Sequence, residues 1–170
     1  MTVADRWLAV LRILTGLLFV ESGVHKLSWA GRVGGLPTPA VSERWQQALP
    51  KRLLEFAEKN PIGGYRAFLY RSAIPNRRLI AALVAWGELL LGLSLAFGLL
   101  ARLASFAGFF LAGNYFLADY WMGPCQRNLG LLLLTIFLVL GSANAGRYWG
   151  VDRWLFPPTP KKTKKGDPAG

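Results

Sequence analysis

One acidic residue lies inside an apolar stretch long enough to cross a bilayer. The stretch AWGELLLGLSLAFGLL, residues 85–100, contains Glu88 and no other charged residue. An ionised side chain at the centre of a spanning helix costs at least about 2.5 kcal/mol, so such a residue normally faces protein or water. Small residues recur on the same helical face: Ala81, Ala85, Gly92 and Ala96. We therefore expect Glu88 to face a closely packed neighbouring helix, either as a proton-handling acid or as a structural hydrogen-bonding group.

Other polar residues in the apolar runs lie at a similar depth. With a rise of 1.5 Å per residue, Glu21, Asn114 and Thr135 fall near the level of Glu88, and each belongs to a different run. This arithmetic predicts one polar layer near mid-membrane, with Glu21 and Glu88 as its carboxylates. Arg12 lies too far toward the amino-terminal end of its run to bond directly to that layer.

A second group of polar residues lies nearer the end of the first run. His25 and Lys26 are close to the expected membrane surface, where a charged group can extend to water, so a surface role is the default expectation. One histidine and one cysteine, Cys125, cannot supply a full metal ligand set, two axial haem histidines or a dithiol. No Gly-rich dinucleotide motif accompanies them. We expect no metal, haem or dinucleotide cofactor.

The composition indicates the elements that must position these residues. Of the 170 residues, 53% are hydrophobic, and the mean hydropathy of +0.32 is too high for an ordinary water-soluble domain. Apolar runs near the 20 residues needed to span hydrocarbon cover 7–27, 79–100, 103–122 and 129–146. The sequence therefore predicts an all-α membrane protein, an antiparallel four-helix bundle forming a single domain over residues 1–155.

The segment 28–78 differs from the rest of the chain. Its Gly/Pro-rich opening GRVGGLPTP predicts a flexible connection, after which Ser42 can cap a helix that stops at Asn60-Pro61. This helical insert is expected at the membrane interface, either on the lipid surface or packed over the mouth of the bundle. Residues 156–170 are too rich in proline and lysine to fold alone and predict a disordered basic tail.

Short connections determine the expected topology. Residues 98–103 must contain the whole second turn, so the second and third spans are expected to be antiparallel neighbours. Both termini and Arg102 then lie on one side, and the insert and residues 123–128 on the other. Because the positive-inside rule is strongest for short loops, the long insert counts for little and cytoplasmic termini are favoured. The net charge of +11 suits anionic lipid headgroups, and without a recognised motif it does not indicate nucleic-acid binding.

Several segments together carry a family resemblance. They are RILTGLLFVESGVHKL in the first span, NPIGGYRAFL in the insert, residues 74–115 through the next two spans, and NAGRYWGVDRWL after the fourth. The chain resembles the DoxX/DoxD family, and more closely its DoxD branch, the membrane subunit type of thiosulfate:quinone oxidoreductase. The resemblance implies a multi-pass protein of a bacterial or archaeal plasma membrane, associated with quinone-linked oxidation of a sulfur compound.

Two kinds of function remain open on these residues. In the first, the chain is a subunit of a redox complex in which Glu21 and Glu88 donate protons to a quinone, the substrate that the family implies. The candidate quinone-binding residues are Asn114, Arg12, His25, Lys26 and Arg102. In the second, the chain is a non-catalytic anchor or a bundle that conducts protons or a small solute. Because the first span is polar on two faces, we expect it to be contacted by the bundle and by either the long insert or a second subunit. With either function we expect a second subunit or a homo-oligomer.

Overall fold

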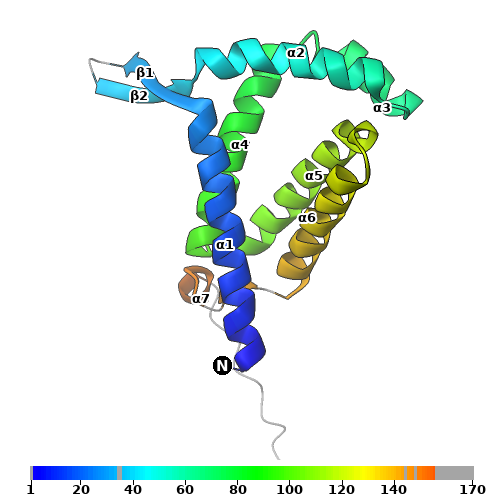
Figure 1. Cartoon of the computed structure of the whole chain (residues 1–170). Helices are drawn as coiled ribbons and strands as arrows, with labels where there is room; N and C mark the ends of the chain where they lie inside the picture. Colours follow the sequence, from blue (N-terminus) through cyan, green and yellow to red (C-terminus); the bar gives the residue numbers. More distant parts are fainter. Residues whose placement is uncertain (1, 34–35, 144, 148, 156–170) are drawn as a thin grey trace, which may run out of the picture.

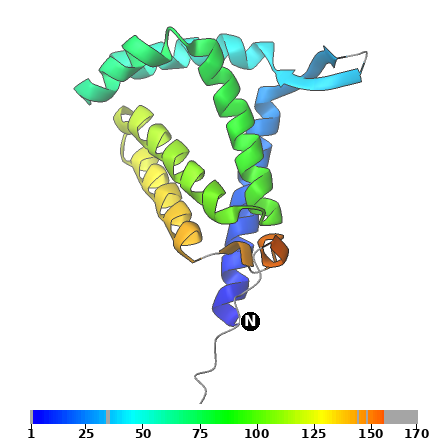
Figure 2. The ribbon, with the colours of Figure 1, turned by 180° about the vertical axis from the view of Figure 1, so that it is seen from behind.

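The computed structural model describes residues 2–33, 36–143, 145–147 and 149–155. The fold of this part is predominantly helical, as expected. Four long helices dominate it: α1 (Val3–Lys26), α4 (Arg77–Phe97), α5 (Ala101–Ala118) and α6 (Pro124–Ser142). Helices α1 and α4 form one antiparallel pair, and α5 and α6 form a second (Figures 1 and 2). The insert lies at one end of these pairs, opposite the amino terminus and the α4–α5 turn (Figure 1).

Three helices of the described residues are long and apolar enough to cross a membrane. They are α1, α4 and α6, and they correspond to the first, second and fourth predicted spans. Helix α5 is the counterpart of the third predicted span, but it has only 18 residues, carries Arg102 in its first turn and is not one of the three. A fourth crossing therefore stays a prediction.

The two helix pairs meet at one end and diverge toward the insert (Figures 1 and 2). A tight turn joins α4 to α5, with Gly98 at φ 66° and Leu100 at φ 50°. The left-handed conformation at Gly98 is inexpensive because glycine has no Cβ. Beyond this turn α5 packs mainly on α6, while α4 packs mainly on α1. The arrangement is thus two packed pairs joined by this turn, and the antiparallel four-helix bundle stays a prediction.

Helices α1 and α4 approach closely along small residues. A Cβ atom placed on Gly92 would lie 2.7 Å from the carbonyl oxygen of Gly16, and one on Gly23 would lie 2.7 Å from the backbone nitrogen of Leu89. Ala81 and Ala85 are buried on the same face of α4. The predicted small-residue strip around Glu88 is therefore a packed face of α4: Gly92 and Ala96 contact α1, whereas Ala81 packs on the insert.

One apolar core joins the four helices in the half of the fold near the α4–α5 turn. Phe19 of α1 contacts Phe137 of α6 edge to face, with ring centroids 5.3 Å apart. The other buried residues of this cluster are Leu91 and Leu95 of α4 and Ala101, Ala104 and Ala112 of α5. The two helix pairs thus share this core near the α4–α5 turn and diverge between it and the insert.

The insert begins with a β-hairpin, which the sequence analysis did not predict. Strand β1 (Leu27–Val33) pairs antiparallel with β2 (Leu36–Val41), with Leu27 opposite Val41. The expectation of a wholly flexible Gly/Pro connection is wrong for these strands. The two residues between them are Gly34 and Gly35, which lie outside the described residues, and a Gly-Gly pair is a favoured hairpin connection.

The rest of the insert is helical and packs over the start of α4. Helix α2 (Glu43–Lys59) begins after Ser42, whose hydroxyl accepts a hydrogen bond from the backbone N–H of Trp45 at 3.3 Å, and it ends before Asn60, as predicted. Helix α3 (Gly63–Phe68) and a π-helical segment (Leu69–Ala73) follow. Leu49, Leu53 and Leu69 form a second buried cluster with Ala81 of α4.

The insert also bonds to the far end of α5. The buried side chain of Asn60 donates a hydrogen bond to the Leu117 carbonyl oxygen at 2.6 Å, and the Tyr65 hydroxyl donates to the Asn114 carbonyl oxygen at 3.1 Å. Burial, together with the charge of Asp119, raises the pKa of Tyr65 to about 12, so this phenol stays protonated as a donor at neutral pH. The insert therefore links the two helix pairs at the end where they diverge.

After α6 the chain turns back toward α1 and α4. A 3-10 turn (Ala145–Arg147) leads to the short helix α7 (Asp152–Leu155). Backbone N–H groups of Val151 and Asp152 donate to the carbonyl oxygens of Phe97 and Gly98 at 3.0 and 2.9 Å. The predicted disordered tail, 156–170, lies outside the described residues.

Candidate functional site

Glu88 is buried between three helices and bonded through both carboxylate oxygens. Its side chain is 2% exposed. One oxygen forms an ion pair with the ammonium group of Lys26 on α1, and the other accepts a hydrogen bond from the hydroxyl of Tyr115 on α5. As predicted, Glu88 faces the protein interior.

The directions of the three helices explain why these side chains meet. Side chains on a helix lean toward its amino terminus. Helices α1 and α5 run toward the insert, and α4 runs away from it (Figure 1). The side chains of Lys26 and Tyr115 are therefore expected to lean away from the insert, and that of Glu88 toward it. The three polar groups therefore converge although their positions along the helix axes differ.

The ammonium group of Lys26 has further partners. It donates to the hydroxyl of Ser22 at 2.8 Å and to the Ser22 carbonyl oxygen at 3.3 Å. It also lies 5.1 Å from the ring centroid of Trp45 on α2, whose indole N–H donates to the carbonyl oxygen of Ala81 at 3.1 Å. The lysine side chain is 17% exposed. Lys26 thus belongs to the site, and the expected surface role is wrong.

The predicted mid-membrane layer does not assemble. Glu21 and His25 lie on another face of α1, with side chains 70% and 78% exposed, and Glu21 Oε1 lies 3.9 Å from His25 Nε2. The side chains of Asn114 and Thr135 bond to carbonyl oxygens of their own helices, at Phe110 and Leu131. Depth arithmetic failed because it placed each residue at its backbone position and ignored the face and lean of the side chain.

Arg12 belongs to a different cluster, at the α4–α5 end of the fold. Its side chain is fully buried, and its guanidinium group donates to the carbonyl oxygens of Ala145 and Trp149 at 2.8 and 3.2 Å. Nearby, the Asp152 carboxylate accepts hydrogen bonds from the backbone N–H groups of Leu100 and Ala101 at 2.6 and 2.9 Å. Arg12 therefore fixes the segment after α6 and does not present a binding group near Glu88.

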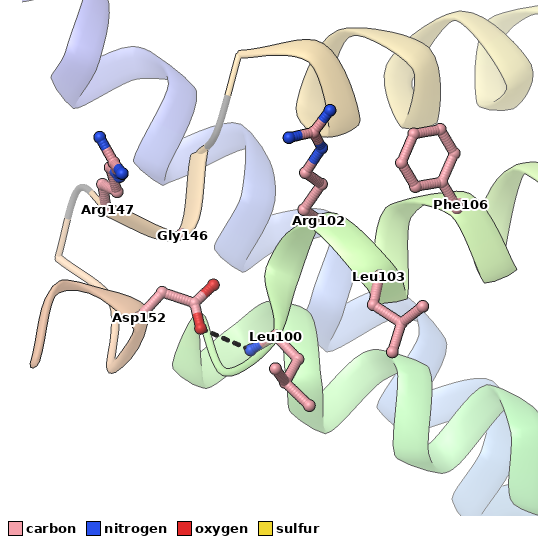
Figure 3. A pocket seen from close by; sticks show the side chains of 7 residues that line it. All are labelled: Leu100, Arg102, Leu103, Phe106, Gly146, Arg147 and Asp152. Atoms are coloured by element: carbon pink, nitrogen blue, oxygen red, sulfur yellow. Dashed lines mark hydrogen bonds between the residues drawn. The ribbon is translucent and has the colours of Figure 1, made fainter. Parts of the chain in front are cut away.

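Arg102 lines a pocket at the same end, away from Glu88 (Figure 3). The pocket has a volume of about 480 Å³. Its walls come from the first turns of α5 and from the segment after α6: Leu100, Arg102, Leu103, Phe106, Gly146, Arg147 and Asp152. Of the candidate binding residues predicted from the sequence, only Lys26 thus lies at Glu88.

The described residues contain no group of three or more His, Cys, Asp or Glu side chains that could hold a metal ion. Cys125, at the start of α6, is exposed. At the Glu88 site a carboxylate contacts an ammonium group and a phenol, and groups of these kinds can hold and exchange a proton.

Sequence reasoning missed Tyr115 altogether. The available signal was its position beside Asn114 in the apolar run 103–122, which directly follows the run that contains Glu88. A buried tyrosine usually needs a partner for its hydroxyl, and Glu88 is an acceptor within reach of an adjoining helix.

Three helices long and apolar enough to cross a membrane, two of which share a buried ion pair, define a multi-pass membrane protein. Over residues 7–166 the chain matches the family model described as TQO small subunit DoxD, and it belongs to the DoxD family. No curated protein and no solved structure matches it.

Proposed function

We propose that this chain is the membrane subunit of a thiosulfate:quinone oxidoreductase-type complex and that Glu88 supplies protons during quinone reduction. The family supports the kind of complex. The single observation that supports the proton role is the contact of the buried Glu88 carboxylate with both Lys26 and Tyr115. Reduction of a quinone to a quinol consumes two electrons and two protons, so a membrane site for it needs a proton donor.

The three groups have complementary parts in this proposal. Tyr115 passes a proton between Glu88 and the quinone oxygen, because a phenol is both donor and acceptor. Lys26 balances the negative charge that Glu88 carries between protonations, since an unpaired carboxylate in a low-dielectric site is costly. Ser22 and Trp45 hold the ammonium group in place. The other predicted site residues have no direct part in proton transfer, because their side chains do not contact Glu88: Glu21, Asn114, His25 and Arg12.

The electrons enter from a second subunit that oxidises the sulfur compound. The chain has one cysteine and therefore cannot form a dithiol–disulfide pair of its own. The family description as a small subunit supports the presence of such a partner. In this arrangement α5 crosses the membrane as the fourth span, the insert lies at the interface, and the protein resides in a plasma membrane with cytoplasmic termini.

A second function, that of a non-catalytic membrane anchor, is favoured by one observation. Both oxygens of Glu88 are already bonded to protein donors, so the site is satisfied without a ligand. In that case the ion pair and the phenol only hold α1, α4 and α5 together.

The test uses the complex purified in mild detergent after coexpression with the adjacent genes. Quinone reduction is measured for the wild type, Glu88→Gln, Tyr115→Phe and the control Glu58→Gln, a carboxylate exposed on α2. Proton donation predicts that Glu88→Gln lowers turnover at least about tenfold in a complex that is still folded at the assay temperature, because the amide keeps hydrogen bonding but cannot supply the acidic proton.

Two outcomes decide against the proton role. Full turnover in the Glu88→Gln complex would rule out proton donation by Glu88 and favour the non-catalytic membrane anchor. Equal losses in Glu88→Gln and Glu58→Gln show a general effect of removing acidic charge rather than one specific to this site.

A further inference from the structure

The pocket at the α4–α5 end has no part in the function proposed above. Its apolar wall consists of Leu100, Leu103 and Phe106, and all three side chains are substantially exposed. Two arginines, Arg102 on α5 and Arg147 on the turn after α6, line it as well, and Figure 3 shows Gly146 between them in that view.

The charge of this pocket is positive. Of its three ionisable lining residues, Asp152 is already engaged by the backbone N–H groups of Leu100 and Ala101. Arg102 and Arg147 are exposed and form no hydrogen bond or ion pair with the residues that the structure describes. Two guanidinium groups are therefore available, and guanidinium groups bind phosphate oxygens with matched geometry.

The position of the pocket suits a lipid better than a water-soluble anion. It lies where α4 ends and α5 begins, beside the end of α6, and this level corresponds to the headgroup region when these helices cross a bilayer. Leu103 and Phe106 lie on one face of α5 at helical spacing and continue from Arg102 toward the membrane interior. Basic pockets at helix ends are a recurrent form of site for anionic lipid headgroups.

We infer that this pocket binds one anionic phospholipid, whose phosphate contacts Arg102 and Arg147 and whose acyl chain lies along Leu103 and Phe106. The inference is independent of the role of Glu88, which lies in another part of the fold. A lipid held here contacts both the start of α5 and the segment that follows α6, so it strengthens the junction of the two helix pairs.

The test is native mass spectrometry of the full chain in detergent, titrated with phosphatidylglycerol. The same titration is carried out with phosphatidylcholine, inorganic phosphate and a short-chain ubiquinone analogue. One phosphatidylglycerol is expected to bind at concentrations at least about tenfold below those needed for phosphatidylcholine. Each of Arg102→Gln and Arg147→Gln should weaken this binding roughly fivefold, and the double variant roughly 25-fold.

Two controls accompany these variants. Arg71→Gln removes an exposed arginine at the opposite end of the fold and should leave phosphatidylglycerol binding unchanged. Leu103→Asn keeps both arginines but makes the apolar wall polar, so it should weaken lipid binding without affecting weak phosphate binding. Circular dichroism establishes that each variant keeps its helix content.

Several results would overturn the inference. These are equal binding of the two phospholipids, unchanged phosphatidylglycerol binding in the double variant, or phosphate binding as tight as that of the lipid. Arginine-dependent binding of the quinone analogue without binding of phosphatidylglycerol would assign the pocket to quinone instead.

Discussion

The ammonium group of Lys26, the last residue of α1, pairs with the carboxylate of Glu88 in the middle of α4. The pair lies directly beyond the glycines at which the two helices approach most closely. It therefore links the end of the first helix, where the insert begins, to the centre of the membrane-spanning part.

Removing either charge of this pair should be more damaging than removing both. Lys26→Met leaves a buried carboxylate without its cation, and Glu88→Leu leaves a buried ammonium group, so each should lower the free energy of unfolding by about 3–5 kcal/mol. The double variant should recover most of that loss. Detergent melting curves of the four proteins measure the coupling, and strictly additive losses would contradict a stabilising contact between the two side chains.

Glycine should be required at position 92 but not at position 87 of the same helix. A Cβ atom on Gly92 would lie 2.5 Å from the backbone nitrogen of Val20, whereas one on Gly87 would meet no other part of the described structure within 4 Å. Gly92→Ala should therefore separate α1 from α4 and lower stability by roughly 1–3 kcal/mol, while Gly87→Ala should be neutral or slightly stabilising. Thermal unfolding of both variants checks this, and equal melting temperatures would rule out close packing at Gly92.

Asp152 should act as a cap for α5 from outside that helix. Its carboxylate accepts hydrogen bonds from the backbone N–H groups of Leu100 and Ala101, so Asp152→Ala should cost about 1–2 kcal/mol of stability. Asp152→Asn keeps one acceptor oxygen and should lose less. Melting temperatures should therefore fall in the order wild type, Asn, Ala, and indistinguishable values would show that the α4–α5 turn is secured by other contacts.

Whether α5 crosses the membrane can be read from cysteine labelling. Cys125 at the start of α6 is the native probe, and Trp29→Cys and Trp154→Cys in a Cys125→Ser background place probes on the exposed hairpin and on α7. If α5 crosses, an impermeant maleimide labels Cys125 from the same side as position 29 and the opposite side from position 154. If α5 does not cross, Cys125 is labelled from the side opposite position 29, and position 154 is labelled from the same side as position 29.

The parts of this fold that were predictable are those set by local sequence. Run length identified the helices, Ser42 and Asn60 marked the ends of α2, and the small-residue strip identified the face of Glu88. The partners of that face were not predictable in the same way. Tyr115 meets Glu88 only because the long side chains of antiparallel helices lean toward each other, which residue depth alone does not describe.

The divergence of the helix pairs and the place of Arg12 depend on contacts between distant parts of the chain. Asn60 and Tyr65 of the insert bond to the far end of α5 and contribute to its position away from α4. The acceptors for Arg12 lie 133 and 137 residues later in the chain. The sequence shows a short turn and an arginine within an apolar run, but it does not show which distant residues will bond to either segment.

The bonds of Arg12 also bear on how the protein is made. Its guanidinium group enters the membrane with α1 at the start of translation, yet the carbonyl oxygens of Ala145 and Trp149 emerge from the ribosome only after on the order of ten seconds. The native hydrogen bonds of this arginine are thus completed by residues that are among the last of the described residues to be synthesised. A nascent chain interrupted before residue 145 lacks both acceptors, which gives membrane quality control a physical difference between unfinished and finished copies.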